Sequence, residues 1–142
     1  MVDVHAFEQL LDRAEANGPI PLMEKAVAFY KGPFLGDPAE PWATSYQERL
    51  RSKLIRAIGK LGLYFEKHGN KEKAIEYYQK GLEVDNLAEE FYQRLMACYK
   101  SGGRKADALS VYDRCRKALL STLGVEPSTR TKAIYESLRL PS

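Results

Sequence analysis

Four cationic side chains of this sequence stand at a spacing that suits anion binding. Arg49, Lys53, Arg56 and Lys60 follow one another in steps of four, three and four residues. On an α-helix this spacing places all four on one stripe. Such a row is able to bind the carboxylates of an acidic peptide or partner protein. A charged row is equally typical of a solvent-facing surface, or of one that pairs with acidic residues of the same chain.

The distribution of charge leaves the same alternatives open. Residues 1–48 carry eight acidic against three basic side chains, a net −5, and the remainder carries 19 basic against 11 acidic, a net +8. This polarity indicates an acidic or nucleic-acid partner, or two parts of one chain that face each other. Direct DNA binding is disfavoured, because acids interrupt the cations and the pI is 8.8, whereas phosphate-binding domains usually exceed about 9.

Residues that could support catalysis or metal binding do not form a recognisable set. Cys98 and Cys115 lie far apart from each other and from the two histidines, His5 and His68, so no metal-ligand spacing is present. We expect both cysteines to be buried and reduced. The glycines near residues 32–36 lack the ending of a phosphate loop, and no nucleophile–base motif occurs. The sequence therefore predicts no catalytic, cofactor or metal site, and a protein that is not an enzyme.

Features that would direct the chain out of the cytoplasm are not apparent in the sequence. The N-terminus MVDVHAFEQL has no basic start followed by an apolar run, so it does not resemble a secretion signal. No apolar stretch approaches the ~18 residues that a membrane span needs. Two cysteines suit a reducing compartment better than a disulfide framework. We therefore expect a cytoplasmic protein.

The elements that position the basic row are indicated by an internal repeat with a period of about 34 residues. This is the period of the tetratricopeptide repeat, a pair of antiparallel helices. We predict two repeats, over residues 55–88 and 89–122. The aligned positions keep the same side chain: Leu61 with Leu95, Gly69 with Gly103, Ala74 with Ala108, and Tyr78 with Tyr112. The glycines mark turns, the alanines allow two helices to approach closely, and the tyrosines fill the space beside them.

The flanking segments complete a single domain over residues 1–142. A degenerate copy of the repeat is expected over residues 5–35, followed by a structural corner loop at 32–41 that Phe34, Leu35 and Trp42 pin by burial. Ser128 is a good N-cap for a last helix at residues 128–139. The predicted fold is all-α, with tetratricopeptide-like antiparallel helical repeats and about seven helices.

Several motifs, taken in order, resemble those of a known family, the bacterial transcriptional activator domain. This is the tetratricopeptide-like module of antibiotic-regulatory and related activators in bacteria. The resemblance covers roughly residues 3 to 140. Its motifs are Tyr30-x-Gly-Pro-Phe-Leu35, Trp42, Glu48-Arg49-Leu50, Leu95-Met96, Gly103-Arg104-x-Ala-Asp-Ala108-Leu109-x3-Tyr112 and Leu123-Gly124-Val125-x-Pro127-Ser128.

The resemblance implies a regulatory, protein-interaction domain of a transcriptional activator. In the family this domain usually follows a winged-helix DNA-binding domain, so we expect the chain to be a piece of a larger regulator that contacts DNA through that other domain. The expected partners are RNA polymerase or its sigma subunit, the parent's DNA-binding domain, and a second copy of the chain.

The resemblance also implies a binding surface. In tetratricopeptide folds the first helix of each repeat lines a concave groove, which adds Lys67, Gln93 and Lys100 to the candidate partner-binding residues. The alternative function is a general scaffold or effector-sensing module that binds a peptide or small ligand in that groove.

Overall fold

The structure is a computed structural model that describes residues 8–9, 11–13, 20–28 and 43–140, with side chains from residue 48 in the last range. The predicted corner loop at 32–41, with Phe34, Leu35 and Trp42, lies outside the described residues. Within them every element is a helix, which confirms the all-α prediction. Residues 8–9 and 11–13 are helical, and the helices with complete bounds are α2 (Ile20–Ala28), α3 (Ala43–Lys67), α4 (Lys71–Val84), α5 (Glu89–Ser101), α6 (Lys105–Leu123) and α7 (Thr129–Arg139).

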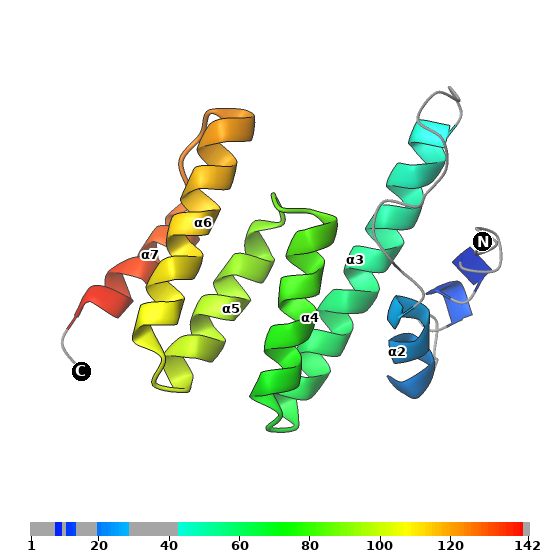
Figure 1. Ribbon diagram of the computed structural model, residues 1–142, viewed down its shortest axis with the longest axis horizontal. Coiled ribbons are helices and arrows are strands. Elements are labelled where there is room, and N and C mark those ends of the chain that lie inside the picture. The colour runs from blue at the N-terminus through cyan, green and yellow to red at the C-terminus, as the bar shows by residue number, and fades with distance from the viewer. Residues whose placement is uncertain (1–7, 10, 14–19, 29–42, 141–142) are drawn as a thin grey trace.

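The helices stand in one row of antiparallel hairpins (Figure 1). Along this row α3 packs on α4, α4 on α5, and α5 on α6, while α7 packs on both α5 and α6. Helix α2 packs on α3 at the other end of the row. Helices α3 with α4, and α5 with α6, form antiparallel pairs over the residues of the two predicted repeats, and α7 follows α6 in the row. The division into repeats stays a prediction.

Helix α3 carries the longest apolar stripe. Its inward positions recur every three or four residues, as one face of a helix requires. Helix α3 has 25 residues, whereas α5, the corresponding helix of the second predicted repeat, has 13. The early turns of α3 lie before residue 55, where the first repeat was predicted to begin, and they support the N-terminal helices. The buried residues of the stripe are Leu50, Leu54, Ala57, Ile58, Leu61 and Phe65.

Glycines in the left-handed backbone region terminate three of the helices. Gly69 between α3 and α4 has φ +78°, Gly103 between α5 and α6 has φ +75°, and Gly124 after α6 has φ +67°. A side chain is strained at such angles, so glycine is favoured there. After the first turn, the Asn70 side chain accepts a hydrogen bond from the backbone N–H of Lys73 at 3.2 Å and caps α4.

Small residues bring α3, α4 and α5 into close contact. Ala74 is fully buried, and Tyr78 is 1% exposed. A Cβ atom at Gly62 would lie 2.3 Å from the Tyr78 ring, and one at Gly81 would lie 2.4 Å from the Phe91 ring. Each ring thus lies directly against a neighbouring helix backbone. This packing sets the short separation on which the groove described below depends.

The α6–α7 end of the row is closed by aromatic packing. Ala108 is fully buried at the start of α6. One turn later, the half-buried Tyr112 ring stacks on Tyr135 of α7 with 4.0 Å between ring centroids. Arg139 lies over the same Tyr135 ring at 5.7 Å from its centroid.

A hydrogen-bonded carboxylate joins the start of α7 to the start of α5. Glu89 accepts hydrogen bonds from the backbone N–H of Ser128 at 2.8 Å and from the hydroxyl of the buried Thr131. Ser128 is the N-cap of α7 and accepts from the Thr131 N–H. Burial alone raises the pKa of Glu89, but the hydrogen bonds from Ser128 and Thr131 outweigh it and hold this pKa below its ordinary value.

Candidate functional site

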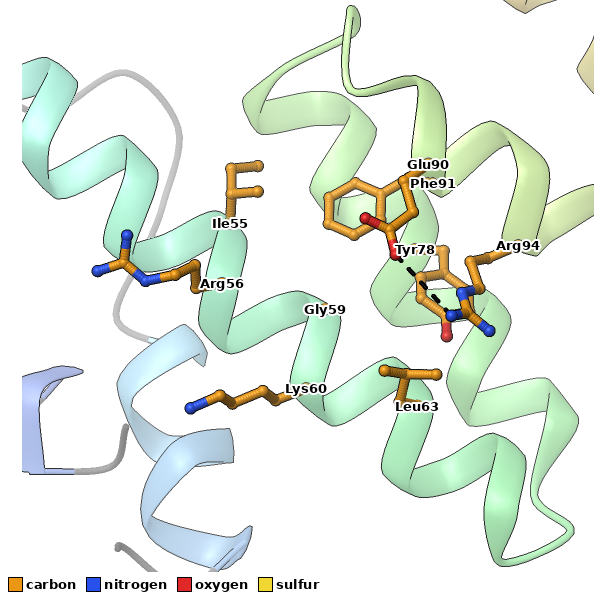
Figure 2. Close-up of a pocket in the computed structure, with 9 residues that line it drawn as sticks. All are labelled: Ile55, Arg56, Gly59, Lys60, Leu63, Tyr78, Glu90, Phe91 and Arg94. Carbon is orange, nitrogen blue, oxygen red and sulfur yellow. Dashed lines mark ion pairs between the residues drawn. The ribbon is translucent and has the colours of Figure 1, made fainter. Parts of the chain in front are cut away.

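A hollow of about 290 Å³ lies between α3 and α5, above α4 (Figure 2). The first helices of the two repeats form its walls, and Tyr78 of α4 lies beneath it. Polar and apolar side chains both contribute. The lining residues are Ile55, Arg56, Gly59, Lys60 and Leu63 of α3, Tyr78 of α4, and Glu90, Phe91 and Arg94 of α5.

Aromatic rings form the base of the hollow. Tyr78 and Phe91 pack against each other with ring centroids 5.8 Å apart, and both are almost completely buried. Ile55 and Leu63 of α3 also line the hollow and are only partly buried. The hollow therefore presents an apolar interior to whatever enters it.

Cations stand on both sides of this apolar interior. Figure 2 shows that Arg56 and Lys60 extend along one side, away from α5, whereas Glu90 and Arg94 stand on the other. The Arg94 guanidinium is 3.8 Å from the Glu90 carboxylate and 3.9 Å from that of Glu66. Tight charge-assisted hydrogen bonds measure about 2.7–2.9 Å, so both ion pairs of Arg94 are long.

Two buried, neutral groups, Tyr78 and Cys98, interact with Glu66, which is one of the carboxylates paired with Arg94. The Tyr78 hydroxyl donates a hydrogen bond to Glu66. Burial and this carboxylate raise the pKa of Tyr78 well above its ordinary range. Burial and the charge of Glu66 also raise the pKa of the Cys98 thiol to about 12, and burial raises that of Cys115 to about 12. Both thiols are therefore protonated at neutral pH, and thiolate chemistry is disfavoured.

The structure divides the basic row of α3. Arg49 and Lys53 bind Glu8, with nitrogen–oxygen distances of 2.8 and 2.9 Å, and Lys53 also lies 2.7 Å from Asp12. The hydrogen bonds from Arg49 and Lys53 lower the pKa of Glu8 to about 2. The hydrogen bond to Asp12 in turn raises the pKa of Lys53. These two cations hold the acidic N-terminal helix against α3.

Two of the remaining candidate residues, Gln93 and Lys100, contact α7. Gln93 donates a hydrogen bond to the Thr131 hydroxyl at 2.8 Å, and Lys100 donates one to the Ser137 hydroxyl at 3.1 Å. Both side chains thus contact α7, and neither is among the residues that line the hollow. Lys67 is exposed at the end of α3. A role for these residues in partner binding stays a prediction.

Three residues that line the hollow were not predicted from the sequence: Arg94, Glu90 and Phe91. For Arg94, the sequence does contain a signal that could have identified it. The repeat period of about 34 residues aligns Arg94 with Lys60. The two cations therefore occupy equivalent positions on the first helices of successive repeats. Glu90 is the residue one turn before Arg94, and its ion pair follows from that spacing.

Other kinds of site find little support in the part of the chain that the structure describes. There, no three His, Cys, Asp or Glu side chains are grouped so as to hold a metal ion. None of the described helices is long and apolar enough to cross a membrane. The hollow combines an apolar base with charged side chains at its edges.

The fold is that of an all-α helical-repeat module, with antiparallel helices packed in a row. The sequence matches the family described as the bacterial transcriptional activator domain over residues 2–139. Since this match spans nearly the whole chain, the protein belongs to that family. The family consists of regulatory domains and is not an enzyme family. No curated protein matches the sequence.

Proposed function

We propose that this domain regulates transcription by binding a segment of a partner protein in the hollow between α3 and α5, hereafter the groove. One observation carries the proposal: the groove combines an open apolar interior with Arg56 and Lys60 on one side and Arg94 on the other. Protein-recognition sites combine apolar anchors with surrounding polar residues in this way. The role is one of binding, in the bacterial cytoplasm, and not of catalysis.

Surface charges support a protein partner over direct DNA contact. Many cations of the described chain lie beside carboxylates, for example Arg104 at 2.8 Å from Asp107 and Lys117 at 2.9 Å from Asp113. A phosphate-binding surface needs cations that are clustered without such interruption. DNA is therefore contacted through another domain of the parent regulator.

RNA polymerase holoenzyme is the partner to test first, because recruitment of polymerase is the direct route from promoter occupancy to activation. The parent's DNA-binding domain and a second copy of the chain are the other candidates. We expect immobilised domain to capture purified bacterial holoenzyme at moderate salt. A variant with Arg56, Lys60 and Arg94 all replaced by Glu should lose this capture.

A matched control makes the result specific to the groove. Arg114, Arg130 and Lys132 are exposed residues of α6 and α7, and their replacement by Glu changes the net charge by the same amount. This control should still capture polymerase, and circular dichroism should show both variants folded. The proposal is contradicted if both variants lose polymerase capture equally. It is also contradicted if the wild-type domain captures no polymerase.

A further inference from the structure

Three glycines of the described chain lie inside helices, and packing explains two of them. Gly62 and Gly81 face aromatic rings so closely that a Cβ atom would lie within 2.5 Å of a ring carbon. Gly59, in the middle of α3, is different. A Cβ atom there would lie 3.6 Å from the Phe91 ring, which is an ordinary van der Waals distance.

Neither backbone geometry nor packing therefore requires glycine at position 59. Its φ is not positive, since Gly69, Gly103 and Gly124 are the glycines of the described residues with that geometry. A glycine inside a helix lowers stability relative to alanine, because the unfolded chain gains more freedom. What Gly59 does provide is open space beside Phe91, since it lines the groove between Ile55 and Leu63 (Figure 2).

We propose that the groove binds a peptide segment in which one bulky apolar residue is flanked by acidic residues, and that Gly59 keeps open the space for the apolar side chain. This inference rests on the proposed function and specifies the chemistry of the partner. The apolar side chain lies over Gly59 and contacts Phe91 and Leu63. The hollow of about 290 Å³ is large enough for it.

Charge complementarity identifies the flanking residues as acidic. Arg56 and Lys60 attract a carboxylate on the α3 side of the groove, and Arg94 attracts one on the α5 side. The ion pairs of Arg94 with Glu66 and Glu90 are 3.9 and 3.8 Å long. A carboxylate of the bound segment that approaches to about 2.8 Å forms a stronger bond with Arg94 than either.

The experiment is a selection from a display library of random short peptides against the whole chain. Peptides that bind should be enriched in one large apolar residue with Asp or Glu on both sides. The selected peptides are then synthesised, and their dissociation constants are measured for the wild type and three variants: Gly59→Leu, Gly59→Ala and Ala133→Leu. Ala133 lies on the exposed face of α7, so its variant adds the same side chain outside the groove.

The expected result is a graded loss of affinity without loss of fold. Gly59→Leu should weaken peptide binding by at least about tenfold, as loss of one anchoring contact does, and Gly59→Ala should weaken it less. Ala133→Leu should leave it unchanged. The midpoint of thermal unfolding of Gly59→Ala should rise, because alanine favours the helix. The inference is wrong if the selected peptides lack acidic residues, or if the library yields no binder. It is also wrong if Gly59→Leu binds the peptides as tightly as the wild type does.

The outcomes separate this inference from the choice of RNA polymerase as partner. If Gly59→Leu blocks the acidic peptides while polymerase capture survives charge reversal of the groove, the polymerase proposal fails and the peptide chemistry stands. If the charge reversal abolishes polymerase capture while Gly59→Leu has no effect on peptide or polymerase, the proposed function stands and this inference is wrong.

Discussion

Arg49 and Lys53 on the early turns of α3 bind carboxylates of the same chain, whereas Arg56 and Lys60, further along the same stripe, line the groove. The four side chains belong to one row with regular spacing, so the row itself does not explain the difference. What differs is the element that each half meets. The early half meets the N-terminal helix with Glu8 and Asp12, and the later half borders the hollow, with its side chains extending away from α5.

This contrast shows that a charged stripe acquires its role from the surface packed against it. The length of α3 is the cause, since its 25 residues reach from the N-terminal helices to the groove. The early half holds the N-terminal helix against α3, and we propose that the later half takes part in recognition.

The core beneath both halves should be the largest contributor to stability. Leu54 lies between the two halves and is fully buried, so Leu54→Ala should lower the free energy of unfolding by about 2–5 kcal/mol. Urea denaturation measures this loss. As a control, Leu123→Ala at a 56% exposed position should change it by less than about 0.5 kcal/mol. Similar values for the two variants would contradict a shared, well-packed core.

Lys53 of the early half should contribute more to stability than Arg94 of the groove. The Lys53 side chain is 18% exposed and lies 2.7 and 2.9 Å from two carboxylates. Lys53→Ala should therefore cost about 1–2 kcal/mol, between the values for exposed and buried pairs. Arg94→Gln, whose ion pairs are long, should cost no more than about 0.5 kcal/mol. A loss for Arg94→Gln as large as that for Lys53→Ala would remove the distinction.

Low pH should weaken the ion pairs that Arg49 and Lys53 of α3 form with Glu8. The pKa of Glu8 is lowered to about 2 in the folded protein from an ordinary value of 4.5. Its contribution to stability is therefore present above about 4.5 and is lost as the pH falls towards about 2. The difference in unfolding free energy between wild type and Glu8→Gln should shrink through this window. The exposed control Glu83→Gln should show no such trend, and a constant Glu8 difference would contradict the ion-pair account.

Salt should have the smallest effect on stability. At about 1 M salt the Debye length falls to about 3 Å, so the exposed Arg49–Glu8 pair should weaken by a few tenths of a kcal/mol. The unfolding free energy of wild type at low and high salt, compared with that of Arg49→Ala, measures this term. A salt dependence that is unchanged in Arg49→Ala would place the effect elsewhere in the chain.

Helix order and helix ends were predictable from the sequence because they depend on local chemistry. Gly69, Gly103 and Gly124 end helices through their backbone freedom, and Ser128 begins α7 through its side-chain cap. The repeat period then predicted which helices pair. Glycine and cap residues lie within a few residues of the helix ends that they determine.

The groove was predictable only in part, because it depends on how separate helices pack. The spacing of Arg56 and Lys60 placed them on one stripe, but the depth of the hollow comes from rings that pack against Gly62 and Gly81. Resemblance to other tetratricopeptide folds suggested Gln93 as a groove residue, yet α7 packs beside α5 and Gln93 hydrogen-bonds to Thr131. Which side chains a following helix covers is a tertiary property that the repeat pattern does not contain.

Single charge reversals in the two regions test whether the groove is the surface that binds the partner. The dissociation constant for RNA polymerase holoenzyme is measured by biolayer interferometry with wild type, Arg94→Glu and Arg49→Glu, which change the net charge equally. Arg94→Glu should weaken binding by at least about tenfold, whereas the dissociation constant of Arg49→Glu should stay within about twofold of that of the wild type. Equal weakening by both, or greater weakening by Arg49→Glu, would contradict the claim that the groove is the partner-binding surface.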